Sequence, residues 1–257
     1  HFYPHHWDIC GDDMTRGVLS IVQGEQSPER INDTVLVLIP KVLNPTLLSQ
    51  FRPISLCNII YKIASKVVAN RLKVVLPDII SENQSAFVPR RLITDNILIA
   101  YECMNTIKRK QGKSGLCAVK LYMHKAYDRV EWCFLKRMME RLGFDNRWVS
   151  LIMACVSSVS YNVCFNGTST DVFHPSRGLR QGDPLSPYLF LLCAEALSSL
   201  LQREEDNGNL VGVRVCRDAP QISHLLFADD SLILMRADGA NAECLRDILD
   251  AYCESSG

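Results

Sequence analysis

The chain has 257 residues, of which 47% are hydrophobic and 22% are charged, and its 28 basic residues are matched by 28 acidic ones. This composition is typical of a folded globular protein of one or two domains, and it excludes a disordered chain and a collagen-like repeat. The charges are unevenly distributed, because residues 41–77 contain six basic residues and no acid, whereas residues 195–254 contain twelve acids and five arginines.

Hydrophobic periodicity and turn residues predict the elements in chain order. Residues 34–39 are rich in branched side chains and predict a strand that ends at Pro40, followed by a loop rich in proline and leucine. The pair Asn166-Gly167 is a strong signal for a hairpin turn. Helices are expected at 58–76, 95–110, 130–142, 147–157 and 187–202, and strands at 115–123, 161–165, 168–173, 211–216 and twice within 224–235. Strands separated by helices and a hairpin, without a regular repeat, indicate an α+β or mixed α/β fold.

The helix expected at 58–76 has an apolar side and a basic side. A helical wheel places Ile60, Ala64, Val67, Val68 and Val75 together, and it places three lysines opposite them. Arg71 is predicted to point into the apolar side. Its side chain either reaches along that surface to water or aims its guanidinium at something that the core frames.

Cysteine usage and hydropathy restrict the location of the protein. The eleven cysteines are scattered without a C-x-x-C pair, which argues against a structural zinc site and predicts free thiols in a reducing compartment. The longest apolar stretch, residues 185–201, contains Pro187 and Glu195 and falls short of a membrane span. We therefore expect a buried helix there and no association with a membrane.

Two adjacent carboxylates, Asp229 and Asp230, lie between apolar segments in L-L-F-A-D-D-S-L-I-L at 225–234. Like charges side by side are unfavourable unless water, a cation or a hydrogen-bond donor compensates them. One interpretation is a hairpin tip in which both residues occupy a tight turn. The other is a site for a divalent cation, because Mg²⁺ prefers oxygen ligands and a turn can present both carboxylates to one side.

Two further segments combine residues that suit ligand binding. The loop R-G-L-R-Q-G-D-P-L-S-P at 177–187 directly precedes a helix, with Ser186 as its expected N-cap and Pro187 at its first position. Its glycines allow a close approach of the backbone to a ligand, although a solvated turn is the plain alternative. The segment K-L-Y-M-H-K-A-Y-D-R-V-E-W at 120–132 predicts a strand that runs into a helix. Its plain interpretation is that Asp128 caps the helix and an aromatic residue packs in the core.

Together these segments resemble the reverse transcriptases of plant LINE-type (non-LTR) retrotransposons. The order K-A-Y-D-R-V-E-W, R-G-L-R-Q-G-D-P-L-S-P and F-A-D-D is similar to the palm of that family. Upstream stretches agree with the family's fingers, namely L-I-P-K at 38–41, F-R-P-I-S-L-C-N at 51–58, Y-K-I-A-S-K-V-V-A-N-R-L at 61–72 and Q-S-A-F-V-P at 84–89. The resemblance covers roughly residues 30 to 237, in the family's order.

The resemblance implies an α+β right-hand polymerase fold with fingers and palm, and no thumb is recognised in the sequence. It implies an N-terminal extension at 1–30, fingers at 31–115, a palm at 116–237 with finger elements inserted, and the start of a C-terminal helix, truncated, at 238–257. The implied activity is RNA-templated DNA synthesis by two-metal phosphoryl transfer.

The family binds two Mg²⁺ ions through three carboxylates, and this chain matches two of them with Asp229 and Asp230. The third position falls at Tyr122, because the family reads L-D-M-x-K-A-Y-D where this chain reads L-Y-M-H-K-A-Y-D. Tyrosine offers a neutral phenol and a bulky ring at neutral pH, so it does not replace a carboxylate. Asp128 follows six residues later and is expected to cap its helix rather than to fill the missing position.

The resemblance also implies nucleotide-binding residues. Tyr127 matches the aromatic residue beneath the incoming sugar, which excludes a 2′-hydroxyl. Gln181 and Gly182, with Arg180 nearby, match the loop that touches the nucleotide and the template. The positions that match finger residues meeting the triphosphate are Arg52 and Lys62.

The basic block between residues 41 and 73 is expected to follow a phosphate backbone with salt-sensitive affinity. Its candidate nucleic-acid-binding residues are Lys66, Arg71 and Lys73. A solvated helix face is the plain alternative for the lysines.

We therefore expect a polymerase fold with weak or absent activity, because Tyr122 removes a metal ligand. The alternative is a non-catalytic nucleic-acid-binding remnant of such an element. The implied partners are an RNA template, a DNA primer and deoxynucleoside triphosphates. The expected location is intracellular, and the family's integration at chromosomal targets favours the nucleus.

Overall fold

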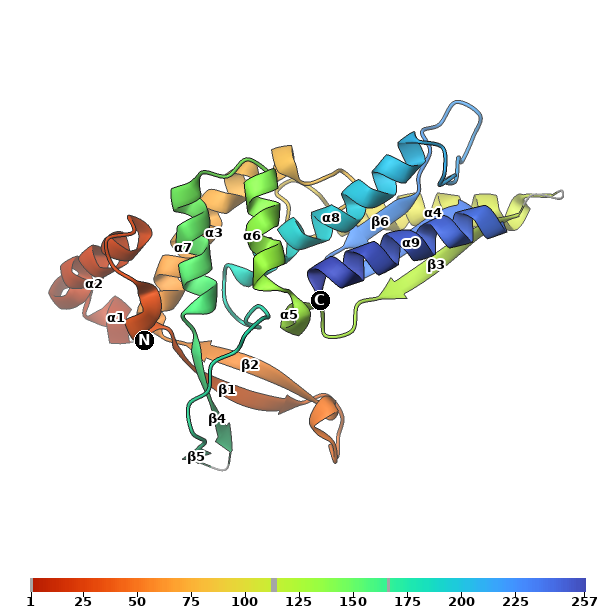
Figure 1. Cartoon of the computed structure of the whole chain (residues 1–257). Helices are drawn as coiled ribbons and strands as arrows, with labels where there is room; N and C mark the ends of the chain where they lie inside the picture. The colour runs from red at the N-terminus through yellow and green to blue at the C-terminus, as the bar shows by residue number, and fades with distance from the viewer. Residues whose placement is uncertain (1, 112–114, 166) are drawn as a thin grey trace.

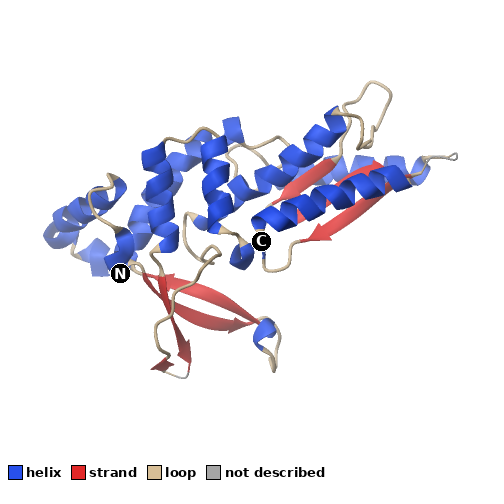
Figure 2. Cartoon of the chain, viewed as in Figure 1, coloured by secondary structure: helices blue, strands red, loops and turns tan. Residues whose placement is uncertain are grey.

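The computed structural model describes residues 2–111, 115–165 and 167–257, and its helices are arranged around two separate sheets (Figure 1). Helices predominate, and the strands are confined to two places in the molecule (Figure 2). This mixture of helices and mainly antiparallel sheet confirms the predicted α+β class.

The first sheet has four strands in the order β2-β1-β4-β5. Its strands are β1 (Asp33–Pro40), β2 (Phe51–Cys57), β4 (Ser160–Phe165) and β5 (Thr168–Ser169). β1 pairs antiparallel with β2 and parallel with β4. The expectation of a loop at β2 is wrong. Pro53 lies inside this strand and is tolerated because β2 is at the edge of the sheet, where a missing N–H breaks no ladder.

The second sheet has three antiparallel strands in the order β3-β7-β6, and helices cover both of its faces. Its strands are β3 (Leu116–Tyr122), β6 (His224–Phe227) and β7 (Asp230–Arg236). Ile233 and Met235 of β7 pack with α8 (Ser186–Asp206) and α9 (Gly239–Ser256). Leu232 and Leu234 point to the opposite face and pack with α4 (Ile93–Arg109), as the alternation along a strand requires.

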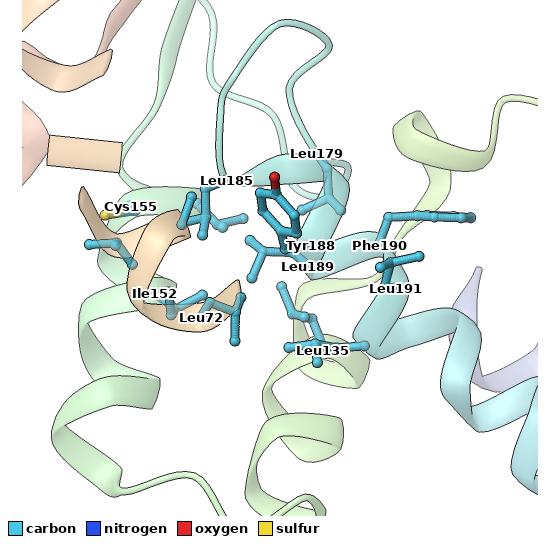
Figure 3. Packing of buried hydrophobic residues seen from close by; sticks show 14 of the residues in the cluster. Leu72, Leu135, Ile152, Cys155, Leu179, Leu185, Tyr188, Leu189, Phe190 and Leu191 are labelled. Carbon is cyan, nitrogen blue, oxygen red and sulfur yellow. The ribbon is translucent and has the colours of Figure 1, made fainter. Parts of the chain in front are cut away.

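The largest core lies where helices from distant parts of the chain meet (Figure 3). Leu72, Leu135 and Ile152 converge there with Leu189 and Leu191 of α8. The helices that contribute are α2 (Trp7–Val22), α3 (Ile59–Ile79), α6 (Trp132–Arg141), α7 (Asn146–Ser157) and α8. The remaining short helices are α1 (Phe2–His5), α5 (Ala126–Arg129) and the 3₁₀ turns η1 (Pro28–Ile31) and η2 (Leu48–Gln50).

Local signals explain several helix ends. Asn58 caps α3, since its side-chain oxygen accepts a hydrogen bond from the Ile60 N–H, and Asp145 caps α7 in the same way. Gly143 follows α6 with a φ of 83°, the left-handed conformation that commonly ends a helix. The helix expected to begin near residue 238 is α9, and Asp238 caps it.

The buried stripe of α3 differs from the predicted one. Its buried residues are Tyr61, Ala64, Ser65, Val68, Ala69, Leu72 and Leu76. Arg71 is exposed, which agrees with a side chain that reaches to water and not with a guanidinium framed by the core, and Val75, predicted on the apolar side, is partly exposed. The predicted apolar side of this helix is centred on its valines, whereas the core packs around Leu72 and Leu76, which lie one turn apart.

Three further predictions need correction. Residues 211–216 form no strand, and Val213 makes only an isolated bridge to Ile222. α8 begins at Ser186 with Leu185 as N-cap, one residue earlier than predicted. β4 and β5 form the predicted hairpin. β5 is shorter than predicted, and beyond it Phe173 makes only an isolated bridge to Tyr161. Asn166 of the predicted turn lies outside the described residues.

The structure also bears on two questions raised by the sequence, namely membrane-spanning helices and the state of the cysteines. None of the helices in the described segments is both long and apolar enough to cross a bilayer. All eleven cysteines are free in the structure.

Candidate active site

The acidic pair lies at the tip of the β6–β7 hairpin. Phe227 pairs with Asp230 at the end of the ladder, so Ala228 and Asp229 form the turn and Asp230 begins β7. The turn is thus one residue earlier than the predicted junction between Asp229 and Asp230. Ala228 has a φ of 53°, in the left-handed region, and both aspartates are exposed.

Tyr122 lies directly beside this pair. It is the last residue of β3 and stands opposite Asp230 in the β3–β7 register. Its side chain is 82% exposed. Lys120, two residues earlier on β3, places its Nζ 3.0 Å from Oδ1 of Asp230. Asp230 therefore has the ammonium of Lys120 as a partner and a tyrosine at the facing position of β3.

These donors do not fit a centre for two divalent ions. Within the described segments, no group of three or more His, Cys, Asp or Glu side chains is placed to hold a metal ion. The turn offers the two carboxylates of Asp229 and Asp230, and Lys120 partners the second of them. At position 122 the neighbouring strand thus offers a phenol and not a third carboxylate.

The acidic turn opens onto a cleft of about 690 Å³ that collects most of the predicted nucleotide-binding residues. Tyr122 and Asp229 line it together with Tyr127, Arg52, Gln181 and Gly182. Lys41, the first residue of the basic block, and Asp128, expected to cap a helix, also line the cleft. The sequence feature that could have pointed to Lys41 as a cleft residue is its position directly after Pro40, the last residue of β1.

Tyr127 lies in α5, and its ring stacks on Phe190 of α8 with the ring centroids 5.1 Å apart. Burial, with a smaller contribution from the negative charge of Asp229, raises the pKa of Tyr127 to about 12. The phenol therefore stays neutral and keeps its proton at physiological pH.

Asp128 does not cap a helix, contrary to the prediction. It lies inside α5, and its Oδ1 accepts a hydrogen bond from Nε2 of Gln181 at 3.4 Å. The N-cap of α6 is Glu131. Asp128 thus contributes a carboxylate to the cleft wall and orients Gln181.

Gly182 allows the loop before α8 to pass close to β2. Its φ is 108°, and a Cβ atom there would lie 3.1 Å from the carbonyl oxygen of Ser55. The carbonyl of Gln181 accepts a hydrogen bond from the Ser55 N–H at 2.8 Å. Glycine is required here by both conformation and space, and the loop links the first sheet to the cleft.

Arg180, predicted to lie near the nucleotide, is among the residues that line the cleft, and its side chain is buried there. The residue is 5% exposed, forms a 2.8 Å ion pair with Asp183 and stacks on the ring of Tyr61 at 4.1 Å. Its guanidinium also donates to Asn32. These donors are directed to protein partners, so the side chain supports the loop that carries Gln181 and Gly182.

The other predicted basic residues lie outside the cleft lining. Lys66 and Arg71 are exposed on α3, and Lys62 is half-buried near its start. Lys73 places its Nζ 5.2 Å above the ring of Tyr188. The cleft therefore brings together the residues from β1, β2, β3, α5 and the acidic turn, but not those of α3.

Comparisons with known proteins agree with this geometry. A sequence model described as "Reverse transcriptase (RNA-dependent DNA polymerase)" matches residues 39–257. The chain is 30% identical over 255 residues to the uncharacterized 149 kDa protein of transposon TX1 from Xenopus laevis, covering 99% of this chain and 19% of that protein. It is 28% identical to a retrovirus-related Pol polyprotein from the type-1 retrotransposable element R2 of Popillia japonica, covering 77% of this chain and 26% of the polyprotein. An uncharacterized mitochondrial protein of Arabidopsis thaliana is 52% identical over 80 residues, covering 28% of this chain and 66% of that protein.

Solved structures show the same fold. The apo telomerase from Candida tropicalis, truncated from its C-terminal domain, superposes with a TM-score of 0.60 at 16% identity, covering 87% of this chain and 48% of that one. The telomerase from Candida albicans in complex with a fragment of telomeric RNA gives a TM-score of 0.57 at 14% identity, covering 89% of this chain and 40% of that one. The chain has the polymerase fold of these enzymes and spans less than half of their length. The chain therefore belongs to the reverse transcriptase (RNA-dependent DNA polymerase) family, and the relatives named above include proteins of a transposon and of a retrotransposable element.

Proposed function

We propose that this chain is the reverse transcriptase domain of a plant LINE-type element in which RNA-templated DNA synthesis is impaired by Tyr122. The observation that carries the proposal is the position of this residue, opposite Asp230 and beside Asp229, in the corner where the family places a carboxylate. The identity with an Arabidopsis thaliana protein supports the plant origin.

The proposed loss follows from the chemistry of phosphoryl transfer. In the family, two Mg²⁺ ions hold the attacking and leaving oxygens, and they must lie about 4 Å apart, which requires a bridging ligand. If its loss removes about 4 kcal/mol of transition-state stabilisation, the rate falls about a thousandfold. The 3.0 Å contact between Lys120 and Asp230 adds to the loss, because it occupies a carboxylate oxygen that an ion would need.

The remaining cleft residues support binding of nucleotide and nucleic acid. Lys41 and Arg52 offer positive charge to phosphate groups at the first sheet, and Gln181 and Gly182 present amide groups from the loop. Tyr127, stacked on Phe190, provides a rigid aromatic surface for a sugar. The proposed partners are an RNA template, a DNA primer and deoxynucleoside triphosphates.

Primer extension on an RNA template tests the proposal. Tyr122→Asp should raise the rate of nucleotide incorporation about a thousandfold over the unaltered chain in Mg²⁺ buffer. Tyr122→Ala is the matched control, since it removes the ring without supplying a carboxylate, and it should stay as slow as the unaltered chain. Robust synthesis by the unaltered chain would refute the impairment.

The second candidate is a non-catalytic nucleic-acid-binding remnant, which the Lys120–Asp230 contact favours. A remnant would bind an RNA–DNA hybrid with unchanged affinity in Tyr122→Asp and would show no incorporation in either form. Gel-shift measurements beside the extension assay separate the two candidates.

The proposed function also implies which sheet belongs to the fingers, which belongs to the palm, and where the protein is located in the cell. We assign the sheet β2-β1-β4-β5 with α3 to the fingers and the sheet β3-β7-β6 with α8 to the palm, with residues 1–30 as an extension. The nucleus is the proposed location, and imaging of a fluorescently tagged chain in plant cells would test it.

A further inference from the structure

The outer edge of β6 is covered by the segment 83–86, which lies far from it in the sequence. The Leu226 N–H donates to the carbonyl of Asn83 at 2.7 Å, and the Ser85 N–H donates to the carbonyl of Leu226 at 3.1 Å. These bonds form a parallel bridge between Gln84 and Leu226. The segment thus extends the second sheet at the strand that leads into the acidic turn.

The side chain of Gln84 reaches past this bridge to the turn itself. Gln84 is 1% exposed, and its Oε1 accepts hydrogen bonds from the Ala86 N–H and the Ala228 N–H, both at 3.0 Å. One buried oxygen therefore joins its own segment to the residue that precedes Asp229.

Ala228 needs such support because of its backbone conformation. Its φ of 53° brings the Cβ of an L-residue close to its own carbonyl oxygen, which is unfavourable for alanine and free of cost for glycine. A conformation of this kind persists only where the surroundings hold it. The backbone conformation of Ala228 sets the direction in which the chain continues into Asp229, the next residue of the turn.

Other amide side chains of the region hold the strand but not the turn. Asn83 donates to the carbonyl of His224 at 3.1 Å, and Asn96 donates to that of Leu226 at 2.9 Å. Nε2 of Gln84 is buried without a hydrogen-bond partner in the structure. The carboxamide is therefore used through its oxygen, and a side chain that keeps only this acceptor should be able to replace it.

We propose that Gln84 is a positioning residue for the acidic turn, which holds Ala228 in its left-handed conformation and so fixes the direction of Asp229. The inference rests on the proposed function only for its effect on catalysis. The effect on the turn is a property of the fold and is measured independently.

Amide hydrogen exchange of the ¹⁵N-alanine-labelled chain tests the first part. Gln84→Met keeps the length of the side chain and removes the acceptor, so the Ala86 and Ala228 amides should exchange about fivefold faster or more. Gln84→Glu retains an oxygen at the same position and should restore the slow exchange. Ser85→Ala is the matched control, because the Ser85 hydroxyl is buried without a partner and its loss breaks no bond.

Kinetics in the Tyr122→Asp background test the second part. Gln84→Met should lower kcat for nucleotide incorporation about tenfold, with the KM for the nucleotide nearly unchanged, and Gln84→Glu should recover most of it. If Tyr122→Asp alone is inactive, the proposed function fails while the exchange experiment still decides the role of Gln84. Unchanged exchange of Ala228 in Gln84→Met would overturn the inference, as would faster exchange of all measured alanines with a lower Tm, which indicates general destabilisation. A shortened variant, Gln84→Asn, gives the same readouts if the methionine variant does not fold.

Discussion

Arg180 and Asp183 stand three residues apart in the loop before α8 and form an ion pair of 2.8 Å whose side chains are each 4% exposed. The pair is fully hydrogen-bonded: Asp183 accepts from the hydroxyls of Tyr61 and Ser65, and Arg180 donates to Asn32. A buried pair is tolerated when its remaining donors and acceptors are satisfied in this way. These charges hold the loop that carries Gln181 and Gly182 against α3 and β1.

Removing one charge of this pair should strongly destabilise the chain. Asp183→Asn leaves the Arg180 guanidinium buried without its counter-charge, and we expect the free energy of unfolding to fall by about 3–5 kcal/mol. Urea unfolding followed by circular dichroism measures it. Asp247→Asn is the control, because the Arg246–Asp247 pair is exposed and should contribute little. Equal effects of the two substitutions would contradict the role given to the buried pair.

At the scale of elements, a buried polar cluster joins α8, β6 and the loop after α3. His224 is fully buried, and its ring nitrogens hydrogen-bond with Ser198 at 2.7 Å and with Ser223 at 2.9 Å. The hydroxyl of Ser198 in turn lies 2.6 Å from the hydroxyl of Ser81, and the Ser81 hydroxyl donates a hydrogen bond to the Glu195 carboxylate. The cluster holds β6, and with it the acidic turn, against the middle of α8.

This cluster predicts a loss of stability in acid. Burial lowers the pKa of His224 to about 4, so between about pH 6.5 and 4 the unfolded chain binds a proton that the folded chain does not. The free energy of unfolding should therefore fall with the pH across this window, by at most about 3 kcal/mol from this group.

Denaturant unfolding at several pH values measures the effect, with His224→Asn as the reference. Burial raises the pKa of Glu195, which stabilises the folded chain as the pH falls and opposes the histidine. Because both chains contain Glu195, the difference between their pH profiles isolates His224. Parallel profiles would show that His224 does not titrate as expected.

At the scale of the whole molecule, the cleft is assembled from both sheets and contains both signs of charge. The β1–β2 hairpin supplies Lys41 and Arg52, and the second sheet supplies Asp229. Although the net charge of the chain is zero, positive charge is concentrated at the wall formed by the first sheet. This arrangement suits a phosphate backbone that approaches from that side.

Binding of an RNA–DNA hybrid should therefore weaken as salt rises. Fluorescence anisotropy between about 50 and 200 mM salt gives the slope of log Kd against log salt, and each lost phosphate contact reduces its magnitude by about one. We expect this reduction for Lys41→Ala and for Arg52→Ala. Arg71→Ala, an exposed arginine outside the cleft, is the control; a reduced slope there would extend the binding surface over α3.

The sequence predicted the site better than it predicted some of the scaffold. Motif order placed Tyr122, Tyr127, Gln181 and Asp229 in one site, and all four line the cleft. The alternation in V-G-V-R-V at 211–215 suggested a strand, but this segment passes so close to its neighbour that a Cβ on Gly212 would lie 2.6 Å from the carbonyl oxygen of Ile222. This close approach of the two backbones depends on where the segment around Ile222 lies, and the periodicity of residues 211–215 carries no information about that segment.

The sequence by itself determined the chemistry at position 122, because the identity of a residue decides whether it offers a carboxylate or a phenol. It also determined the α+β class and the presence of α3, α4, α6, α7 and α8, since periodicity and caps act within a few residues, but it did not predict α2. Only the tertiary structure decided that Arg180 is buried in an ion pair with Asp183, and that Gln84 reaches the turn before Asp229. The physical reason is that burial and hydrogen-bond partners depend on segments distant in the chain, and local patterns carry no information about which of them meet.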